Sequence, residues 1–227
     1  MLLKLQEHDL RIAICEIGRR MYDKSLVAAT DGNISVRTDG NVLITPSGVC
    51  KGDLTPDMIL KVGLNGELRG GNGLPSSEMK LHLRVYTSAP QFKAVIHAHP
   101  PYATAFAVAG ATFSPLSYPT SYAVLGEIPL ARYAVASTDE LASSIEPFVT
   151  AGKQAILMEN HGAVTCGESV RDAYYLMERL EAHAKIDYLA KHLGGARELT
   201  EEEKKRFLKL DAHNDTPVSH HRLTADY

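Results

Sequence analysis

The sequence predicts one α/β domain in which helices flank a central, mainly antiparallel sheet. Strand patterns joined by short turns outnumber strand–helix–strand units, which favours antiparallel pairing. The chain has 227 residues, of which 44% are hydrophobic, enough for one sizeable core. No internal repeat or low-complexity linker divides it, so we expect residues 1–227 to form a single domain. Residues 200–227 are expected to be a C-terminal helix and a mobile tail.

The first third of the chain predicts a helix followed by two hairpins. Apolar residues recur at helical spacing from Leu10 to Met21. Alternating patterns then surround the turn at 38–41 and the turn at Asn65-Gly66, where Asn or Asp with Gly tolerates positive φ. Pro75-Ser76-Ser77-Glu78 is typical of a helix start, and that helix is expected to run to about Tyr86.

The rest of the chain predicts strands and helices around one unassigned stretch, residues 111–137. The expected elements, in chain order, are a strand at 94–99, a helix at 104–109, a helix at 139–149, strands at 155–158 and 163–166, and a helix from 168 to a C-cap at Gly194-Gly195. The apolar positions that we expect to form the buried side of this last helix are Leu176, Leu180, Ile186, Leu189 and Leu193.

Composition excludes several classes of function. Lys and Arg number 24 against 27 Asp and Glu, a net charge of −3 that argues against a basic nucleic-acid-binding surface. No apolar stretch approaches the ~20 residues that cross a bilayer, and the N-terminus lacks the features of a signal peptide. Cys15, Cys50 and Cys166 are widely spaced, which indicates free thiols and a reducing compartment. We therefore expect a cytoplasmic protein.

Three histidines form the strongest candidate site. His97 and His99 lie at i and i+2 of an expected strand and so point to one face. His161 lies at a turn, beside Gly162, which permits close backbone approach. Three histidines with an open position are the pattern of a catalytic zinc site. For the His-x-His pair alone, a surface or core role is the commoner interpretation.

A second candidate site consists of short Gly- and Ser-rich loops. Ser76 and Ser77 precede the expected helix, whose N-terminal N–H groups would suit a phosphate. Ordinary helix capping explains the same residues equally well. Asp31-Gly32-Asn33 and Thr45-Pro46-Ser47-Gly48 would be plain turns alone, yet they are the kind of loop that surrounds a phosphate group.

These motifs, in this order and spacing, resemble the class II aldolase/adducin superfamily, and most of all its L-fuculose-1-phosphate aldolases. The segments that carry the resemblance are Asp31-Gly32-Asn33-Ile34-Ser35, Thr45-Pro46-Ser47-Gly48, Pro75-Ser76-Ser77-Glu78, His97-Ala98-His99 and Asn160-His161-Gly162. Each segment alone is a weak signal, but five in register make coincidence improbable. The match covers roughly residues 5–195.

The resemblance implies a role for each of these positions. It implies that His97, His99, His161 and Glu78 hold a zinc ion, and that Glu78 then acts as general base. It implies that the phosphate of dihydroxyacetone phosphate is bound by Gly32, Asn33, Ser47, Gly48, Ser76 and Ser77. It also implies a tyrosine proton donor from a neighbouring subunit, best matched by Tyr118 with Tyr122 as a rival, and a homotetramer with sites at subunit interfaces.

The implied chemistry suits these residue types. Cleavage of a carbon–carbon bond beside a ketone leaves an enediolate, which a divalent cation stabilises as a Lewis acid. A nearby carboxylate moves a proton to or from the carbon, and a phosphate cradle orients the reacting end. Zinc is the expected ion, although manganese, cobalt or iron would suit the same donors.

We therefore predict a metal-dependent aldolase that reversibly cleaves a ketose 1-phosphate to dihydroxyacetone phosphate and an aldehyde. The ketose is L-fuculose 1-phosphate or a related compound; a salvage aldolase for 5-deoxyribulose or 5-methylthioribulose 1-phosphate is an alternative. A sugar-phosphate epimerase resembling L-ribulose-5-phosphate 4-epimerase is disfavoured, because those enzymes carry aspartate in place of Glu78. An adducin-like interaction module lacks the histidines, and the phosphate loops argue against a metal hydrolase.

Two positions depart from the family pattern. Asp31 stands where many relatives have a small residue, which is expected to adjust the loop without removing its N–H groups. The nearest relatives use a tyrosine near the C-terminus. Tyr227 is the last residue here and cannot be aligned with that tyrosine, so we interpret it as part of a frayed end.

Overall fold

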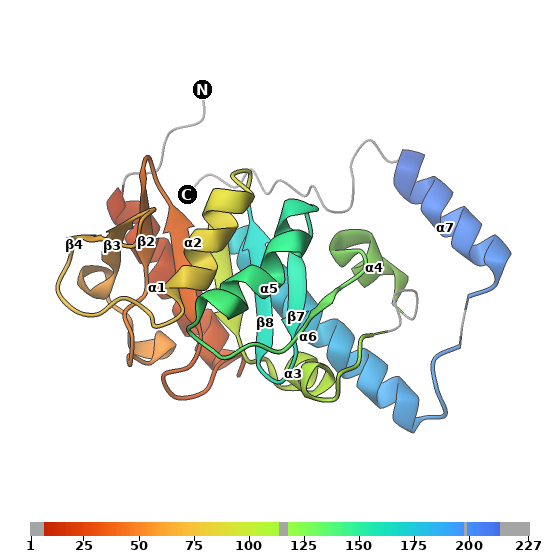
Figure 1. The fold of residues 1–227 in the computed structure, drawn as a ribbon. Coiled ribbons are helices and arrows are strands. Elements are labelled where there is room, and N and C mark those ends of the chain that lie inside the picture. Colours follow the sequence, from red (N-terminus) through yellow and green to blue (C-terminus); the bar gives the residue numbers. More distant parts are fainter. Residues whose placement is uncertain (1–6, 114–117, 198, 214–227) are drawn as a thin grey trace.

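Eight strands form one sheet in the order β4-β3-β2-β1-β5-β8-β7-β6, and all neighbours pair antiparallel except β6 and β7. The structure is a computed structural model that describes residues 7–113, 118–197 and 199–213 (Figure 1). The strands are β1 (Asn33–Arg37), β2 (Asn41–Ile44), β3 (Leu60–Gly63), β4 (Leu68–Gly70), β5 (Ala94–Ala98), β6 (Leu130–Ala131), β7 (Ala155–Met158) and β8 (Gly162–Gly167). The predicted fold class and both predicted hairpins are confirmed.

Helices cover both faces of this sheet. The helices are α1 (Glu7–Asp23), α2 (Met79–Ser88), α3 (Pro101–Val108), α4 (Pro119–Leu125), α5 (Asp139–Thr150), α6 (Val170–His192) and α7 (Glu201–His213), with short 3₁₀ turns at Lys51–Asp53 and Pro56–Met58. The C-terminal residues 214–227, which include the predicted mobile tail and Tyr227, lie outside the described residues.

Alternation along the strands divides the core into two layers. On β1, Ile34 and Val36 pack with α1, α3 and α6, whereas on β5 the side chain of Val95 joins the layer formed with α2 and α5. Asn33 and Ser35 alternate with Ile34 and Val36 and therefore point toward the α2 side. The buried polar residues of β1 thus lie in the same layer as α2, which begins next to Glu78.

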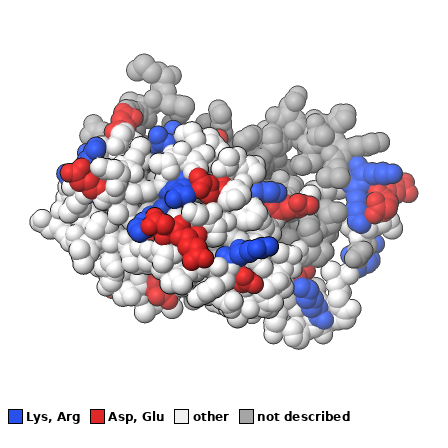
Figure 2. Space-filling view, viewed as in Figure 1, with Lys and Arg blue, Asp and Glu red and all other residues white. Residues whose placement is uncertain are grey.

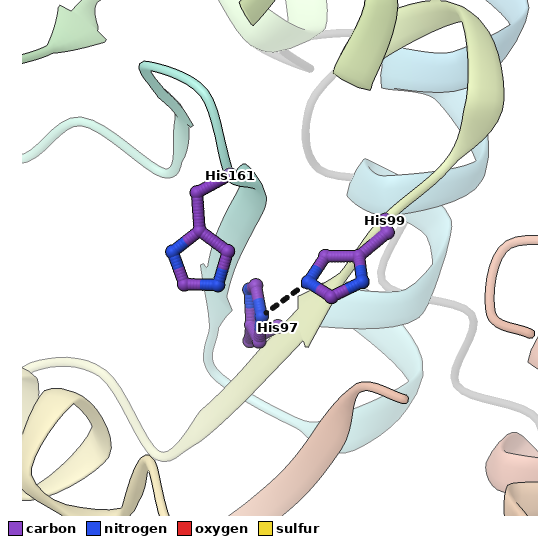
Figure 3. A group of neighbouring side chains, drawn as sticks. All are labelled: His97, His99 and His161. Atoms are coloured by element: carbon purple, nitrogen blue, oxygen red, sulfur yellow. Dashed lines mark hydrogen bonds between the residues drawn. The ribbon is translucent and has the colours of Figure 1, made fainter. Parts of the chain in front are cut away.

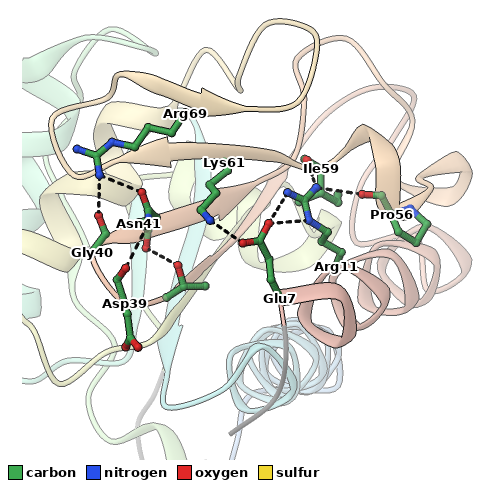
Figure 4. Close-up of polar contacts among 10 residues, drawn as sticks. Glu7, Arg11, Asp39, Gly40, Asn41, Pro56, Ile59, Lys61 and Arg69 are labelled. Carbon is green, nitrogen blue, oxygen red and sulfur yellow. Dashed lines mark hydrogen bonds and ion pairs between the residues drawn. The ribbon is translucent and has the colours of Figure 1, made fainter.

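Charged side chains attach α1 to the far edge of the sheet (Figure 4). The carboxylate of Glu7 accepts from Nη2 of Arg11 at 2.7 Å and from Nζ of Lys61 on β3 at 2.7 Å. Arg11 also donates to the backbone carbonyls of Pro56 and Ile59. These bonds hold α1 against the segment that leads into β3.

Helix α3 begins three residues before the predicted helix at 104–109. Pro101 occupies the first turn, where a missing N–H is harmless. The carboxylate of Glu181 on α6 accepts from the N–H groups of Tyr102 at 3.0 Å and Ala103 at 2.9 Å. A distant side chain, which local pattern cannot reveal, thus caps this helix and fixes the chain just after His99.

Two elements lie in the stretch where the sequence indicated none. Helix α4 begins at Pro119, and β6 pairs in parallel with β7 through Leu130 and Ala131. Both elements are short and depend on tertiary contacts, which explains the weak sequence signal. Residues 114–117 lie outside the described part of the chain.

The predicted buried side of α6 is correct in its first half and wrong in its second. Leu176 and Leu180 are buried, but Ile186, Leu189 and Leu193 are 41%, 46% and 88% exposed. The buried side continues instead through His183, Ala184 and Asp187. In Figure 1 the C-terminal part of α6 extends past the sheet, so its apolar residues have no strand to cover.

The surface agrees with the mixed charge of the sequence. Acidic and basic groups are interspersed on the face shown in Figure 2. Between α2 and α5, Lys80 pairs with Asp139 and Arg84 with Glu146. Among the described residues, no helix has both the length and the apolar character to cross a membrane. All three cysteines are free, as predicted.

Candidate active site

Three imidazoles converge where β5 ends and β8 begins (Figure 3). His97 lies on β5, His99 follows the strand by one residue, and His161 ends the turn before β8. Their ligating nitrogens all lie within 4.8 Å of one another. The strand predicted at 94–99 ends at Ala98, but His97 and His99 still share a face, with their Nε2 atoms 3.1 Å apart.

Glycine makes this convergence geometrically feasible. A Cβ atom on Gly162 would lie 2.6 Å from the carbonyl oxygen of Ala98 and 2.6 Å from Cδ2 of His99. Real Cβ atoms do not approach so closely, so a larger residue would push β8 away from β5. The predicted close backbone approach beside His161 is therefore confirmed.

The second ring nitrogens fix how two of the imidazoles are oriented. Nδ1 of His97 donates to the carbonyl oxygen of Ala163 at 2.9 Å, and Nδ1 of His99 lies 3.5 Å from Oδ2 of Asp31. A ring whose Nδ1 carries the proton presents its Nε2 lone pair to the centre, as metal-binding histidines commonly do. Asp31, noted in the sequence only as a departure, is thus the carboxylate partner of His99.

Glu78 faces the same centre from the residue before α2. Its Oε2 lies 3.0 Å from Nε2 of His97 and accepts from Nδ2 of Asn33 at 3.0 Å, while Oε1 lies 3.1 Å from Nε2 of His161. The residue is 6% exposed. Helix α2 begins at Met79, slightly later than predicted, so Glu78 serves as its N-cap position.

Burial and charge shape the titration of this cluster. Burial alone would raise the pKa of Glu78, but the charge of His97 and hydrogen bonds from His161, His97 and Asn33 lower it well below its usual range. Burial alone would lower the pKa of His97, yet the Glu78 carboxylate raises it. Burial and the charges of His97 and His161 lower the pKa of His99 to about 4. The metal-free cluster therefore holds an ionised carboxylate against the Nε2 atoms of His97 and His161.

This donor set fits a divalent cation. Among the described side chains, Nδ1 of His161 is buried without a hydrogen-bond partner, and Oε1 of Glu78 is buried against Nε2 of His161 at 3.1 Å. Three imidazole nitrogens with a carboxylate match the ligands and the coordination number of a catalytic zinc site. The four predicted metal ligands are thus brought together.

The predicted phosphate-binding residues lie on three neighbouring loops. The loops at 45–48 and 74–76 pair through the bridge between Pro46 and Pro75 and through hydrogen bonds from Ser47 N to Leu74 O (2.9 Å) and from Ser76 N to Thr45 O (3.1 Å). Ser47, Gly48 and Ser77 are exposed. The N–H groups of Ser47 and Ser76 hold the loops together, which leaves hydroxyl groups and other N–H groups to serve a ligand. We call these loops, with residues 31–33, the cradle.

The third loop of the cradle touches the histidine cluster. Gly32 has φ of +73°, and a Cβ there would lie 2.9 Å from the carbonyl oxygen of His97. Asn33 pairs with His97 across β1 and β5. Its side-chain Nδ2 donates to Oε2 of Glu78, and its contact with a phosphate stays a prediction. Asn33 thus connects the cradle to the carboxylate.

A buried lysine joins two loops of the cradle from beneath. Nζ of Lys51 donates to the carbonyl oxygens of Thr30 at 2.9 Å and Val49 at 2.5 Å, the residues that adjoin the cradle loops 31–33 and 45–48. The residue is 1% exposed, and burial lowers its pKa. Its ammonium group contributes positive potential where an anion is expected.

The two tyrosine candidates lie on α4 and at its start. The ring of Tyr118 packs against that of His183 on α6, with centroids 5.8 Å apart, and Tyr122 is half-buried. The predicted donor comes from a neighbouring subunit, so the choice between Tyr118 and Tyr122 stays a prediction.

Comparison with known proteins agrees with this geometry. The family model described as "Class II Aldolase and Adducin N-terminal domain" matches residues 12–188. The chain belongs to the class II aldolase and adducin family. The predicted resemblance is confirmed, and it extends over most of the chain.

Relatives within the family are named for different activities. The 3-oxo-tetronate 4-phosphate decarboxylase of Escherichia coli K12 is 36% identical over 81% of this chain and 88% of that protein. A 5-deoxy-D-ribulose 1-phosphate aldolase of Bacillus thuringiensis serovar kurstaki is 31% identical over 88% and 93%. A solved L-fuculose 1-phosphate aldolase superposes with a TM-score of 0.81 at 30% identity, over 90% of this chain and 96% of that one. The family therefore includes lyases that break carbon–carbon bonds in sugar phosphates.

Sequence reasoning missed three residues that the structure connects to the site: Asp31 as the partner of His99, Lys51 beneath the cradle, and His82 behind Asn33. His82 lies four residues after Glu78, one helical turn along α2, and that spacing is the signal that would have pointed to it. It also missed decarboxylation as a candidate reaction, because no motif separates it from aldol cleavage.

Proposed function

We propose that this protein is a metal-dependent class II lyase that forms or consumes the enediolate of dihydroxyacetone phosphate. One observation carries the proposal: the Glu78 carboxylate lies 3.0 and 3.1 Å from Nε2 of two converging histidines and touches the cradle through Asn33. A base, a cation site and an anion cradle are thereby contiguous. We assign aldol cleavage of a ketose 1-phosphate as the first candidate reaction.

The cradle binds the substrate by its phosphate and orients the ketone. The hydroxyl groups of Ser47, Ser76 and Ser77 and the N–H groups of Gly48 and Ser77, with the loop at Gly32 and Asn33, donate to the phosphate oxygens. Lys51 adds positive potential nearby. Binding energy from this remote group positions the reacting carbons without itself changing between ground state and transition state. Removal of the phosphate from the substrate should therefore reduce turnover as well as affinity.

Glu78 moves the proton at the carbon beside the ketone. In the condensation direction it takes this proton, the enediolate carbon attacks the aldehyde carbon, and Tyr118 donates a proton to the aldehyde oxygen. The cation held by His97, His99 and His161, which we propose to be Zn²⁺ with Mn²⁺, Co²⁺ or Fe²⁺ as substitutes, acts as a Lewis acid that stabilises the negative charge. Asn33 keeps Oε2 of Glu78 in place through its 3.0 Å hydrogen bond.

Decarboxylation is the second candidate, supported by the 36% identity to a 3-oxo-tetronate 4-phosphate decarboxylase. Loss of CO₂ from such a 3-oxo acid leaves its bonding electrons in the same enediolate, which Glu78, carrying a proton, protonates to dihydroxyacetone phosphate. No aldehyde oxygen takes part, so this reaction needs no tyrosine donor. The salvage substrates 5-deoxyribulose and 5-methylthioribulose 1-phosphate belong to the first candidate.

The assembly and location stay proposals as well. We propose a homotetramer with sites at subunit interfaces, because the proton donor is expected from a neighbouring subunit. We also propose a cytoplasmic location, consistent with three free cysteines. The partner expected at the site is a small sugar phosphate rather than nucleic acid or membrane.

Product analysis with a tyrosine variant separates the two reactions. The metal-loaded protein is incubated with L-fuculose 1-phosphate, 5-deoxyribulose 1-phosphate and 3-oxo-tetronate 4-phosphate, and dihydroxyacetone phosphate, aldehyde and CO₂ are measured. An aldolase releases aldehyde, and Tyr118→Phe or Tyr122→Phe slows it ~100-fold or more. CO₂ release that both tyrosine variants leave intact would identify a decarboxylase. No product from any of the three would contradict the proposed function.

A further inference from the structure

A buried chain of polar side chains runs from the core between α2 and β1 to the active-site carboxylate. The hydroxyl of Tyr86 lies 2.7 Å from Oγ of Ser35, which lies 2.6 Å from Nδ1 of His82. Nε2 of His82 is bonded to Oδ1 of Asn33, whose Nδ2 donates to Oε2 of Glu78 at 3.0 Å. All five residues are at most 6% exposed. Buried polar groups need partners to avoid a large desolvation cost, and here each member has its neighbour in the chain as a partner.

The hydrogen bonds of this chain have one self-consistent direction. The carboxylate of Glu78 only accepts, so Asn33 must present its NH₂ group there, which turns its Oδ1 toward His82. An amide oxygen also only accepts, so Nε2 of His82 carries the proton. Burial lowers the pKa of His82 to about 3, which keeps the ring neutral and makes Nδ1 an acceptor of the Ser35 hydroxyl. Every donor from Tyr86 to Asn33 then points toward Glu78.

This direction removes the ambiguity of the Asn33 amide. An asparagine side chain can rotate by 180° and exchange its oxygen for its nitrogen at little cost when nothing fixes it. With His82 donating to Oδ1, the exchange would place an amide oxygen against the carboxylate of Glu78 and an NH₂ group against the N–H of His82. Both contacts are repulsive, so His82 enforces the single useful orientation.

We propose that His82 is a positioning residue that acts through Asn33 to hold Glu78 for proton transfer. The inference rests on the proposed function, because it gives Glu78 the role of base. The contacts of His82 run to Asn33 and Ser35, and it acts on the reaction only by fixing the amide that holds the carboxylate. Partners of this kind typically change activity or metal affinity ~10–100-fold when they are removed.

The tautomer of His82 gives a test that needs no substrate. Long-range ¹H–¹⁵N spectra show, for each histidine ring, which nitrogen is protonated. The set of signals that disappears in His82→Gln belongs to His82. The proposal requires protonated Nε2 and unprotonated Nδ1 at pH 7, with the ring still neutral at pH 5. A proton on Nδ1 instead, or a charged ring at pH 7, would overturn it.

Three variants test the effect on the reaction. His82→Gln retains an N–H donor near Nε2, His82→Leu fills the space without one, and Tyr86→Phe removes only the far end of the chain. Deuterium exchange into dihydroxyacetone phosphate, melting temperature and bound metal per chain are measured for each. We expect His82→Leu to lose 10–100-fold in exchange rate at unchanged metal content, His82→Gln to regain most of this loss, and Tyr86→Phe to stay within about threefold of the wild type.

The outcomes separate this inference from the proposed function. If the wild type shows no exchange, the proposed function fails. If the wild type exchanges and a folded His82→Leu protein exchanges within twofold of it, the role of His82 is wrong. If His82→Leu does not fold, His82→Met takes its place, because it also fills the space without an N–H donor to Asn33. An exchange rate within twofold of the wild type in that folded protein would also contradict the proposal.

Discussion

The two ends of the candidate site are built from different materials. At the metal end, side chains of His97, His99 and His161 project from strand ends, and Glu78 lies among them. At the phosphate end, the cradle consists of loop backbone and hydroxyl groups, held together by loop-to-loop hydrogen bonds and by Lys51. Strand geometry fixes side chains within a fraction of an ångström, whereas loops shape a surface that binds an anion through N–H groups.

The difference teaches which property each end controls. Substitutions at the metal end should abolish chemistry and leave phosphate binding in place. Substitutions at the cradle should weaken phosphate binding or the fold and leave the metal in place. Asn33 is the point where the two ends meet, since it belongs to a cradle loop and donates to Glu78.

The largest effect is expected for His99→Ala. Loss of one of three imidazole ligands should remove the metal and reduce turnover ~1,000-fold or more, because Lewis-acid stabilisation is worth several kcal/mol. Bound metal per chain and cleavage rate measure this effect. His192→Ala, an exposed histidine near the end of α6, is the control and should retain both. Retained activity in metal-free His99→Ala would contradict the claim that turnover needs the metal held at this end of the site.

Glu78→Gln should separate chemistry from metal binding. The amide is nearly isosteric and three imidazoles remain, so the metal content should stay close to that of the wild type. Proton exchange into dihydroxyacetone phosphate should fall ~100- to 10,000-fold, the usual range for a lost general base. Glu127→Gln, on the exposed surface, serves as the control. Exchange at the wild-type rate would show that Glu78 is not the base.

Lys51→Met tests the cradle end. Removal of the buried ammonium group takes away positive potential and the link between Thr30 and Val49, so inorganic phosphate should bind ~10-fold more weakly while the metal content stays unchanged. Calorimetric titration with phosphate measures the affinity. Lys80→Met removes an exposed charge on α2 and should have little effect. Equal affinities for wild type and Lys51→Met would show that the lysine only supports the fold.

Two glycines of the cradle have the same backbone conformation but different surroundings, so alanine substitutions should lower the stability of the fold by different amounts. Gly32 and Gly48 have φ of +73° and +72°, but a Cβ on Gly32 would lie 2.5 Å from Cγ1 of Val27, whereas a Cβ on Gly48 would meet nothing within 4 Å. Gly48→Ala should therefore cost about 1 kcal/mol of unfolding free energy from strain alone, and Gly32→Ala about 3 kcal/mol. Urea unfolding measures both values. Equal losses of unfolding free energy in the two variants would contradict this prediction and would mean that Val27 moves aside at no cost.

The smallest effect concerns the pH dependence of stability. The pKa of His82 falls from 6.5 in its ordinary state to about 3 in the fold because the ring is buried. The folded ring stays neutral while the unfolded ring takes up a proton below pH 6.5, so its contribution is present above that pH and is lost as the pH falls toward 3. Relative to His82→Gln, the metal-free wild type should lose about 1 kcal/mol per pH unit between pH 6 and 5. Parallel curves for the two proteins would contradict the buried neutral state.

The sequence predicted the metal end more fully than the cradle. Strand periodicity places His97 and His99 on one face, and a turn glycine explains His161, so local pattern suffices there. The orientation of Asn33 toward Glu78, the bond from Lys51 to Thr30 and the contact of Asp31 with His99 join residues 21 to 68 positions apart. No local pattern encodes such contacts.

The same reasoning explains the elements that prediction missed. The strand β6 has two residues and exists because β7 lies beside it, and α3 begins early because Glu181 caps it. The second half of α6 has a helical apolar pattern but lies beyond the sheet, so periodicity predicted burial where no partner layer exists in this chain. Periodicity identifies an element but does not determine what covers it.

Deuterium exchange into dihydroxyacetone phosphate in D₂O, without any aldehyde and with or without a chelator, tests the central claim most directly. Both candidate reactions share the enediolate, so the metal-loaded protein should exchange the proton beside the ketone. The chelator should abolish this exchange, and Glu78→Gln should lack it. Absence of exchange in a metal-replete wild-type protein, or exchange that persists after the metal is removed, would contradict metal-assisted enediolate formation at this site.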